Sequence, residues 1–278
     1  MSAPLYRTAS AAEVALMLDW AAEEGWNPGA DDATAFHAAD PQGFFVAEIR
    51  GIPVAAISVV VHSETMAFLG LYLCHPDYRG RGIGYALWTH ALEHAGGRTV
   101  GLDGVAAQQE NYAKSGFALA GSTTRYEGRL DGRADAQVRP LVVADAPAVA
   151  RLDLAANGYA RPAFLLAWMA KSARRQSYVM EERGRITGFA TLRRCRQGAK
   201  IGPVIAADTE AALRLVRAAL ADHPATPVII DLPEANAPLA EALIALGFEA
   251  TFATARMYRG PAPQAGPMLQ AIATMELG

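Results

Sequence analysis

Residues 71–88 read LYLCHPDYRGRGIGYALW, in which an apolar strand ends at a proline and a helix opens on alternate glycines, Gly80, Gly82 and Gly84. Glycines let the backbone approach a ligand closely, and the unpaired N–H groups of a first helical turn attract phosphate oxygens. Arg79 and Arg81 add positive charge to this turn. The stretch therefore predicts a pyrophosphate site, and the alternative is a tight strand-to-helix turn without a ligand.

The glycine spacing argues against two other nucleotide sites. A dinucleotide fingerprint needs Gly-x-Gly-x-x-Gly in the first strand–helix unit of a parallel sheet, whereas Gly-x-Gly-x-Gly here follows at least two hairpin strands. A nucleotide triphosphate loop ends in Gly-Lys-Ser or Gly-Lys-Thr, and Ile83-Gly84-Tyr85 supplies neither the ammonium group nor the Mg²⁺-binding hydroxyl. A nucleotide-binding regulator stays open as a rival, and it requires that ATP or NAD compete for this loop.

An internal repeat organises the rest of the chain. Residues 44–55 predict two strands joined at Gly51, and residues 177–188 have the same layout around Gly184, at an offset of 133. Two helical stretches end in Gly-Phe at Phe117 and Phe248, at an offset of 131. The repeat predicts two copies of one module, at 1–132 and 137–260, and a C-terminal tail at 261–278.

Each copy is expected to have an α+β fold. In the first copy a helix over 11–24 precedes a hairpin over 44–62, a third strand over 66–74 and a helix over 82–95. Because antiparallel hairpins come first and strand–helix–strand crossovers follow, each module should be a mixed, mostly antiparallel sheet flanked by helices. In the tail, three prolines predict irregular structure as far as one docking helix over 268–275.

The composition predicts a globular protein with small partners. Of 278 residues 52% are hydrophobic, and the formal net charge is −3, so no basic field exists to hold nucleic acid or an anionic membrane. No stretch approaches the roughly 18 apolar residues of a membrane span, and the N-terminus does not read as a signal peptide. Cys74 and Cys195 are expected to be free thiols. We therefore expect a cytoplasmic protein.

Two motifs resemble those of the GNAT superfamily of N-acetyltransferases. The stretch from Arg79 to Gly84 fits the family's Arg/Gln-x-x-Gly-x-Gly/Ala signature, and the stretch from Tyr112 to Phe117 resembles its later Tyr-x-x-x-Gly-Phe segment. The whole chain resembles a tandem GNAT protein, in which an active N-terminal module precedes a divergent one.

The resemblance implies an acetyl-CoA site and no metal. The pantetheine would lie along Leu73 and Cys74, and Tyr112 would give a proton to the leaving CoA thiolate. Many relatives carry Asn where this chain has Val105, so a hydrogen bond to the pantetheine is either missing or supplied by Gln108. The backbone amides on the pyrophosphate would be those of Arg79, Gly80, Arg81, Gly82, Ile83 and Gly84.

The second copy lacks the glycine ladder. Asp208 and Glu210 favour a helix N-terminus but repel a pyrophosphate, and Leu243 stands where the first copy has Tyr112. Asn236 retains the asparagine that the first copy lost. We therefore expect that this copy binds no CoA and instead shapes the acceptor site or a dimer surface.

The sequence names no general base for the acceptor amine. The strand over 66–74 has no acidic residue, and the loop over 25–32 is where the family usually forms an acceptor wall. Cys74 is expected to be a core residue, and 193–196 a solvated, basic sheet edge. The candidate bases, each of which also reads as a surface, turn or capping residue, are Glu24, Asp31, Asp32, Glu64, His62 and His75.

We therefore expect an N-acetyltransferase that moves acetyl from acetyl-CoA to a primary amine in a ternary complex. We expect a small molecule or a peptide as the acceptor, and a homodimer is left open as the assembly. The alternative is a non-catalytic acyl-CoA-binding or interaction protein, because no general base is identified.

Overall fold

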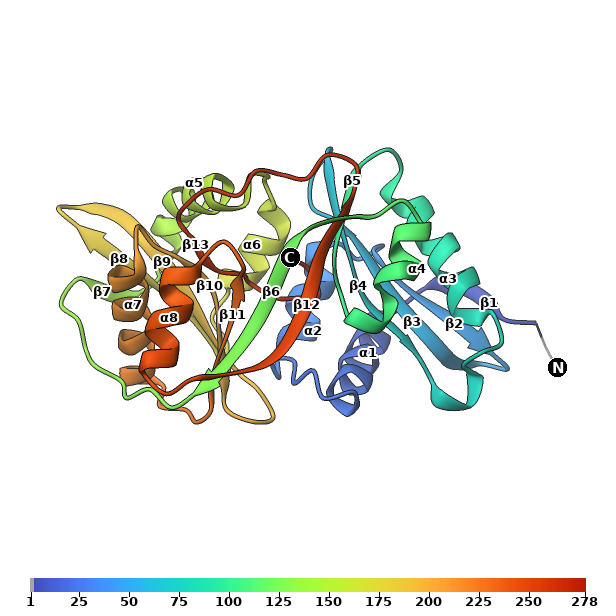
Figure 1. The fold of residues 1–278 in the computed structure, drawn as a ribbon, viewed down its shortest axis with the longest axis horizontal. Helices are drawn as coiled ribbons and strands as arrows, with labels where there is room; N and C mark the ends of the chain where they lie inside the picture. Colours follow the sequence, from blue (N-terminus) through green and yellow to red (C-terminus); the bar gives the residue numbers. More distant parts are fainter. Residues whose placement is uncertain (1–2) are drawn as a thin grey trace.

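The computed structural model describes residues 3–278, and a single mixed sheet runs through both halves of the chain (Figure 1). The strands follow the order β1-β2-β3-β4-β5-β12-β6-β11-β10-β9-β8-β7, and β13 pairs with β10. Most neighbours are antiparallel, whereas β4 with β5 and β10 with β11 are parallel. This confirms the predicted fold class of mixed, mostly antiparallel sheets flanked by helices.

The first half begins with a helix that the sequence caps well. Ser10 and Glu13 form a capping box, since each side chain accepts a hydrogen bond from the other's backbone N–H at the start of α1. The elements of this half are β1 (Leu5–Thr8), α1 (Ala11–Glu23), α2 (Asp32–Ala39), β2 (Phe44–Ile49), β3 (Ile52–Val61), β4 (Met66–Cys74), η1 (Pro76–Tyr78), α3 (Ile83–Leu92), η2 (Glu93–Ala95), β5 (Thr99–Gly104), η3 (Ala106–Gln108), α4 (Gln109–Lys114) and β6 (Ala118–Gly128).

The second half repeats this order. Asp208 caps its long amphipathic helix, because the carboxylate accepts a hydrogen bond from Ala211 N at 2.9 Å. The elements are β7 (Val138–Pro140), η4 (Val143–Asp145), α5 (Ala146–Asn157), α6 (Pro162–Met169), β8 (Arg175–Glu182), β9 (Arg185–Arg194), β10 (Ala199–Ile205), α7 (Thr209–Asp222), β11 (Val228–Pro233), α8 (Ala237–Ala245), β12 (Glu249–Arg259) and β13 (Leu269–Ala271).

The two halves exchange their last long strands. β12 of the second half pairs with β5 of the first, while β6 of the first half pairs with β11 of the second. β6 and β12 also pair with each other, and Figure 1 shows them running side by side from one lobe to the other. The sheet therefore has no break at residue 132, and the limits 1–132 and 137–260 remain predictions of where the sequence repeat runs.

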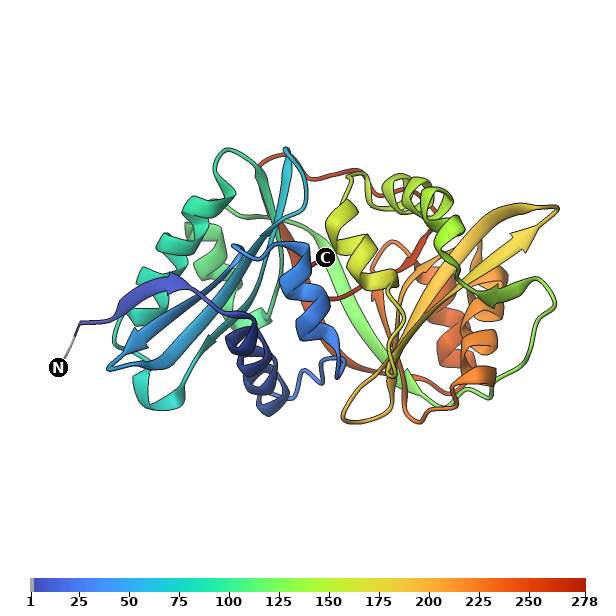
Figure 2. The ribbon, with the colours of Figure 1, turned by 180° about the vertical axis from the view of Figure 1, so that it is seen from behind.

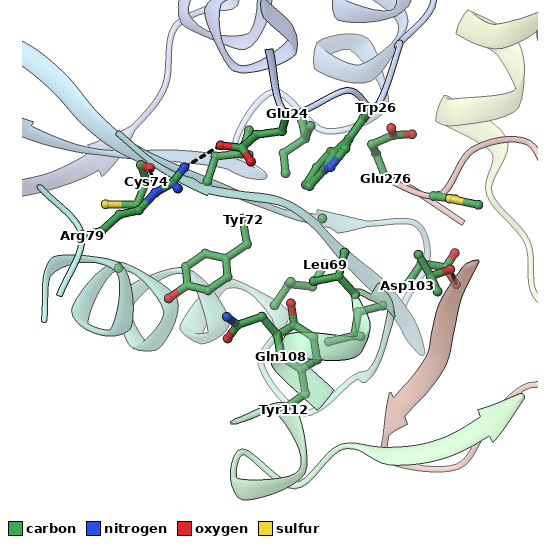
Figure 3. A pocket seen from close by; sticks show the side chains of 18 of the residues that line it. Glu24, Trp26, Leu69, Tyr72, Cys74, Arg79, Asp103, Gln108, Tyr112 and Glu276 are labelled. Carbon is green, nitrogen blue, oxygen red and sulfur yellow. Dashed lines mark hydrogen bonds and ion pairs between the residues drawn. The ribbon is translucent and has the colours of Figure 1, made fainter. Parts of the chain in front are cut away.

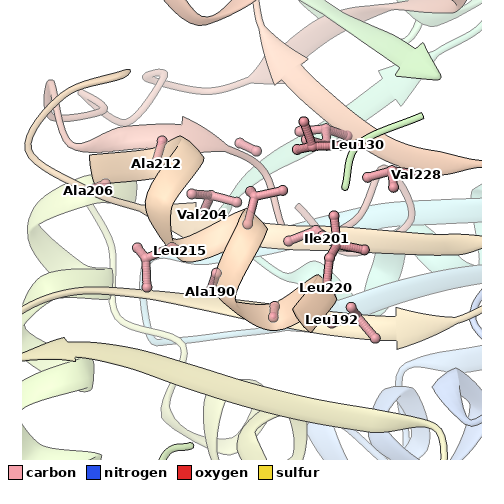
Figure 4. Close-up of a cluster of buried hydrophobic side chains, with 14 of the residues drawn as sticks. Leu130, Ala190, Leu192, Ile201, Val204, Ala206, Ala212, Leu215, Leu220 and Val228 are labelled. Carbon is pink, nitrogen blue, oxygen red and sulfur yellow. The ribbon is translucent and has the colours of Figure 1, made fainter. Parts of the chain in front are cut away.

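Each lobe has apolar cores on the faces of the sheet. In the first lobe α3 covers one face with Leu87 and Trp88, while α1 and α2 cover the other. In the second lobe α7 lays its apolar stripe over β9 and β10 (Figure 4). The buried residues of that stripe are Ala212, Leu215, Val216, Ala219 and Leu220.

The lobes meet through α2 and α6, which face each other in Figure 2. Phe36 stacks on Trp168 with 6.0 Å between ring centroids. Asp32 accepts hydrogen bonds from Arg175, at 3.0 Å, and from Arg193, and both guanidinium groups lie over the Trp168 ring. Burial alone would raise the pKa of Asp32, but Arg193 and Arg175 hold it below its ordinary range.

This interface corrects the prediction of a solvated basic edge at 193–196 for Arg193, whereas Arg196 is exposed as expected. Arg193 is buried and paired, and β9 lies inside the sheet between β8 and β10. The charge looked like a surface feature because its partner, Asp32, is 161 residues away in the sequence.

The prediction of a docking helix over 268–275 is wrong. β10 and β11 pair only at Ala199 and Lys200, and β13 pairs with the part of β10 beyond them. Ile272 N then donates to Asp231 O of β11 at 3.0 Å. The tail is therefore extended and not helical, because its backbone satisfies the hydrogen-bonding groups that the diverging strands leave unpaired. Residues 272–278 continue, buried, between the lobes.

No helix in residues 3–278 is both long enough and apolar enough to cross a membrane.

Candidate active site

A cavity of about 590 Å³ lies where β4 and β5 separate. The two strands pair in parallel only as far as Leu69 and Leu102. Beyond that point Leu71 adopts φ 47°, and the pairing of β4 with β3 shifts register, as at a β-bulge. The bulge turns the end of β4 away from β5 and leaves a gap through the sheet.

All of the predicted site residues line this one cavity. They come from the end of β4, from the turn before α3, from the first residues of α3 and from α4, and Figure 3 shows several of them. The residues are Leu73, Cys74, Arg79, Gly80, Arg81, Gly82, Ile83, Gly84 and Tyr112.

Each glycine of the turn is required for a structural reason of its own. Gly80 and Gly82 have φ values of 73° and 77°, in the left-handed region where a side chain is strained. A Cβ on Gly84 would lie 2.9 Å from the Tyr72 hydroxyl oxygen. The first turn of α3 is therefore open to a ligand along its backbone, as an anion site requires.

The Arg79 side chain fastens this turn to the neighbouring elements. Its Nε donates to Cys74 O at 2.9 Å, and its Nη2 donates to Glu24 Oε1 at 2.5 Å. Arg81 lies over the Tyr78 ring, 5.2 Å from its centroid. Arg79 thus fixes the path of the turn, whose backbone presents the N–H groups.

Tyr112 reaches the cavity from α4 with its ring firmly packed. The ring stacks on Trp88 at 5.4 Å between centroids, and a Cβ on Gly104 would lie 2.4 Å from Tyr112 Cε2. Burial, and next the nearby Tyr72, raise the pKa of Tyr112 to about 12. The phenol is therefore protonated throughout the neutral range.

Gln108 lies beside Tyr112 in the cavity wall (Figure 3). Asn111 Nδ2 donates to Gln108 Oε1 at 2.9 Å, which leaves the Gln108 NH₂ group as a donor. Val105 lines the same wall with an apolar side chain. The geometry is compatible with the prediction that Gln108 supplies the hydrogen bond that Val105 cannot make.

Cys74 and His75 do not form a nucleophile and its base. Burial raises the pKa of the Cys74 thiol, although Arg79 and Arg81 oppose the shift, and a raised pKa disfavours the reactive thiolate. His75 is exposed at the start of η1, where its Nδ1 accepts a hydrogen bond from Asp77 N at 3.4 Å. His75 is therefore the turn residue that its neighbour Pro76 suggested.

The structure places the candidate general bases in different environments. Glu24 lines the cavity, as does Trp26 from the loop over 25–32. Asp31 accepts from the Ser172 hydroxyl at 2.6 Å, Asp32 belongs to the pair with Arg175 and Arg193, and Glu64 is exposed in the β3–β4 turn. His62 is buried, and its Nε2 donates to Leu277 O of the tail at 2.7 Å.

Sequence reasoning missed the wall opposite the turn. The residues of this wall belong to the exchanged strands and to the tail, so no local sequence motif predicts them. They are Arg125 from β6, Phe252 and Thr254 from β12, and Met275 and Glu276 from the tail.

The second lobe has the corresponding gap, and the tail fills it. Asn236 Nδ2 donates to Gln270 O and to Gln270 Oε1, both at 2.8 Å. Leu243, the counterpart of Tyr112, is fully buried in the core. The asparagine kept in this copy thus holds β13 of the chain itself.

Comparisons with known proteins assign both halves of the chain to acetyltransferase domains. A model of the acetyltransferase (GNAT) family matches residues 12–117, and a model of an acetyltransferase (GNAT) domain matches residues 149–268. A holothin acyltransferase from Pseudoalteromonas sp. (strain SANK 73390) is 35% identical over 276 residues, which are 98% of this chain and 94% of that protein.

Solved structures share the fold. A putative acetyltransferase from Pyrococcus horikoshii has a TM-score of 0.83 at 20% identity, covering 100% of this chain and 97% of that one. A tandem GNAT protein from the clavulanic acid biosynthesis pathway has a TM-score of 0.65 at 20% identity, covering 93% and 99%.

Proposed function

Since the chain belongs to the GNAT family of acetyltransferases, with two such domains in tandem, we propose that it transfers acetyl from acetyl-CoA to a primary amine of a small molecule. The observation that carries the proposal is the cavity through the sheet, which has the glycine turn at one end, Tyr112 in its wall and a separate set of residues beyond β4. Cofactor and acceptor then enter from opposite faces and meet in the gap, as direct transfer in a ternary complex requires.

The turn and the end of β4 hold the cofactor in this proposal. Backbone N–H groups from Arg79 to Gly84 bind the pyrophosphate at the N-terminus of α3. Beyond Leu69, β4 no longer pairs with β5, so its backbone at Leu73 and Cys74 can exchange hydrogen bonds with the amides of the pantetheine.

Tyr112 acts on the departing sulfur. The amine nitrogen attacks the thioester carbon, the C–N bond forms, and the C–S bond breaks with its electron pair on sulfur. A phenol with a pKa of about 12 is a weaker acid than a thiol, whose reference pKa is about 8.5. Tyr112 therefore stabilises the sulfur mainly by donating a hydrogen bond while negative charge develops there.

The far wall favours a small acceptor with an apolar body. Trp26, Phe252 and Met275 supply two aromatic rings and a thioether. A volume of about 590 Å³ is typical of small-molecule sites. The relative that is 35% identical is a holothin acyltransferase, which supports a small-molecule acceptor over a peptide.

Release of free thiol from acetyl-CoA with a panel of small amines tests the proposal. Tyr112→Phe should lower kcat by about 10²- to 10³-fold, as removal of one hydrogen-bond donor to a developing negative charge does, and leave acetyl-CoA affinity unchanged. Tyr126→Phe, on β6 outside the cavity, is the matched control. Binding of acetyl-CoA without thiol release from any amine would favour the non-catalytic alternative, and full activity of Tyr112→Phe would remove the role of Tyr112.

A further inference from the structure

Among residues 3–278, three carboxylates line the cavity, and two of them are paired with arginines. Glu24 pairs with Arg79 at the turn. Asp103 pairs with Arg256, whose Nε and Nη2 donate to its two oxygens at 2.9 and 2.6 Å. The third is Glu276 of the tail, whose Oε2 accepts a hydrogen bond from the Thr274 hydroxyl.

The tail brings Glu276 to a strand that has no acid of its own. β4 carries glycine at position 70, and a Cβ there would lie 2.1 Å from Glu276 O. The backbone of the tail thus occupies the space that a side chain on β4 would take next to the gap. Figure 3 shows Glu276 with Trp26 on one side of β4, and Tyr112 with Gln108 on the other.

Two cations lie near Glu276, and each of them is held by other groups. Arg125 and Lys200 bring positive charge close to it. Arg125 is bound to Asp231 at 2.7 and 3.0 Å, and Lys200 Nζ donates to Trp26 O at 2.9 Å. Both cations are thus hydrogen-bonded to groups other than Glu276.

We propose that Glu276 accepts the proton of the incoming ammonium group, so that the tail of the divergent half supplies the general base. The proposal rests on the proposed acetyl transfer. The ammonium gives one proton to the Glu276 carboxylate, and the free amine attacks the thioester carbon. The C–N bond forms and the C–S bond breaks, the second amine proton ends on the CoA sulfur, and Glu276 returns its proton to solvent.

Glu276→Gln tests this role, because an amide still accepts the Thr274 hydrogen bond but cannot take a proton. Its kcat/KM is measured with alkylamines, whose ammonium pKa is about 10 as in lysine, and with aromatic amines that are already neutral at the assay pH. We expect a loss of about 10²- to 10⁴-fold with alkylamines and little loss with neutral amines. Acetyl-CoA affinity and the melting temperature should stay unchanged.

Two further variants control the experiment. Glu276→Asp keeps a carboxylate and should recover part of the activity with alkylamines. Glu234→Gln changes an exposed carboxylate outside the cavity and should behave as wild type.

An equal loss with both amine classes, or no loss, would overturn the role of Glu276. If the wild-type protein releases thiol while Glu276→Gln is fully active, only this proposal falls. If the wild-type protein releases no thiol with any amine, the acetyl-transfer proposal falls as well.

Discussion

Gly70→Ala should displace the tail at Glu276 while leaving the rest of the site unchanged. The added Cβ would lie 2.1 Å from Glu276 O, whereas ordinary contacts begin near 3.4 Å, so the tail must withdraw by about 1.3 Å. Gly70 needs no left-handed backbone, since its φ lies outside the positive range. A misplacement of about 1 Å in a catalytic arrangement costs on the order of 100-fold in rate, and that loss is expected for kcat/KM with an alkylamine.

The assay is thiol release from acetyl-CoA at saturating cofactor, together with calorimetric titration of acetyl-CoA. The three atoms nearest to the new methyl group all belong to Glu276, so cofactor affinity should match that of wild type. Gly121→Ala is the matched control, because its Cβ would have Glu234 Oε2 as its nearest atom, at 3.8 Å. Unchanged kcat/KM for Gly70→Ala would refute the argument, and so would an equal loss in the control.

Two predictions concern how the tail is held. Because burial, aided by Arg161, lowers the pKa of His62 to about 4, the unfolded chain binds its proton more readily, and stability falls by up to about 3 kcal/mol as the pH drops from about 6.5 to about 4. Urea unfolding at neutral and acidic pH should show a smaller difference for His62→Gln, and an equal difference would contradict this. Asn236→Ala leaves the Gln270 carbonyl without its partner and should cost about 1–3 kcal/mol, with faster amide exchange at 269–271; unchanged stability and exchange would show that other contacts hold the tail.

The turn could be predicted from the sequence because its determinants are local. Gly80 and Gly82 take left-handed φ values within the segment they terminate, and Tyr112 follows β5 by a short connection in the same lobe. Each needs only the neighbouring strand and helix to reach the cavity. The composition and the repeat then sufficed for the fold class, since the order of strands and helices already implies a mixed sheet.

The wall beyond β4 could not be predicted because its position depends on pairing across the whole chain. Arg125 and Phe252 reach the cavity only because β6 and β12 change places between the lobes. In an isolated module the order of elements would place each of these strands in its own sheet. Glu276 depends in turn on the path of the tail, whose apolar residues match a helical pattern as well as a buried extended one.

The buried ion pairs could not be predicted for a related reason. Asp32 and Arg193 look like solvated charges when each is considered with its sequence neighbours, since charged residues are rarely buried without a partner. Their pairing over Trp168 appears only when α2 of one lobe meets β9 of the other. Removing one member would strand the other in the interface, at a cost of about 3–5 kcal/mol.

The tail that fills the gap of the second lobe also reaches the cavity of the first lobe. Strands that diverge in both copies expose backbone groups that must find partners. In the first lobe the gap remains as a cavity, and in the second β13 satisfies β10 while Asn236 binds Gln270. A tail anchored there leaves the second lobe in a fixed direction, and its next residues pass β4 at Gly70. The filled gap is thus the anchor that places Glu276 at β4, and the contacts that close the second gap also fix the position of the proposed base.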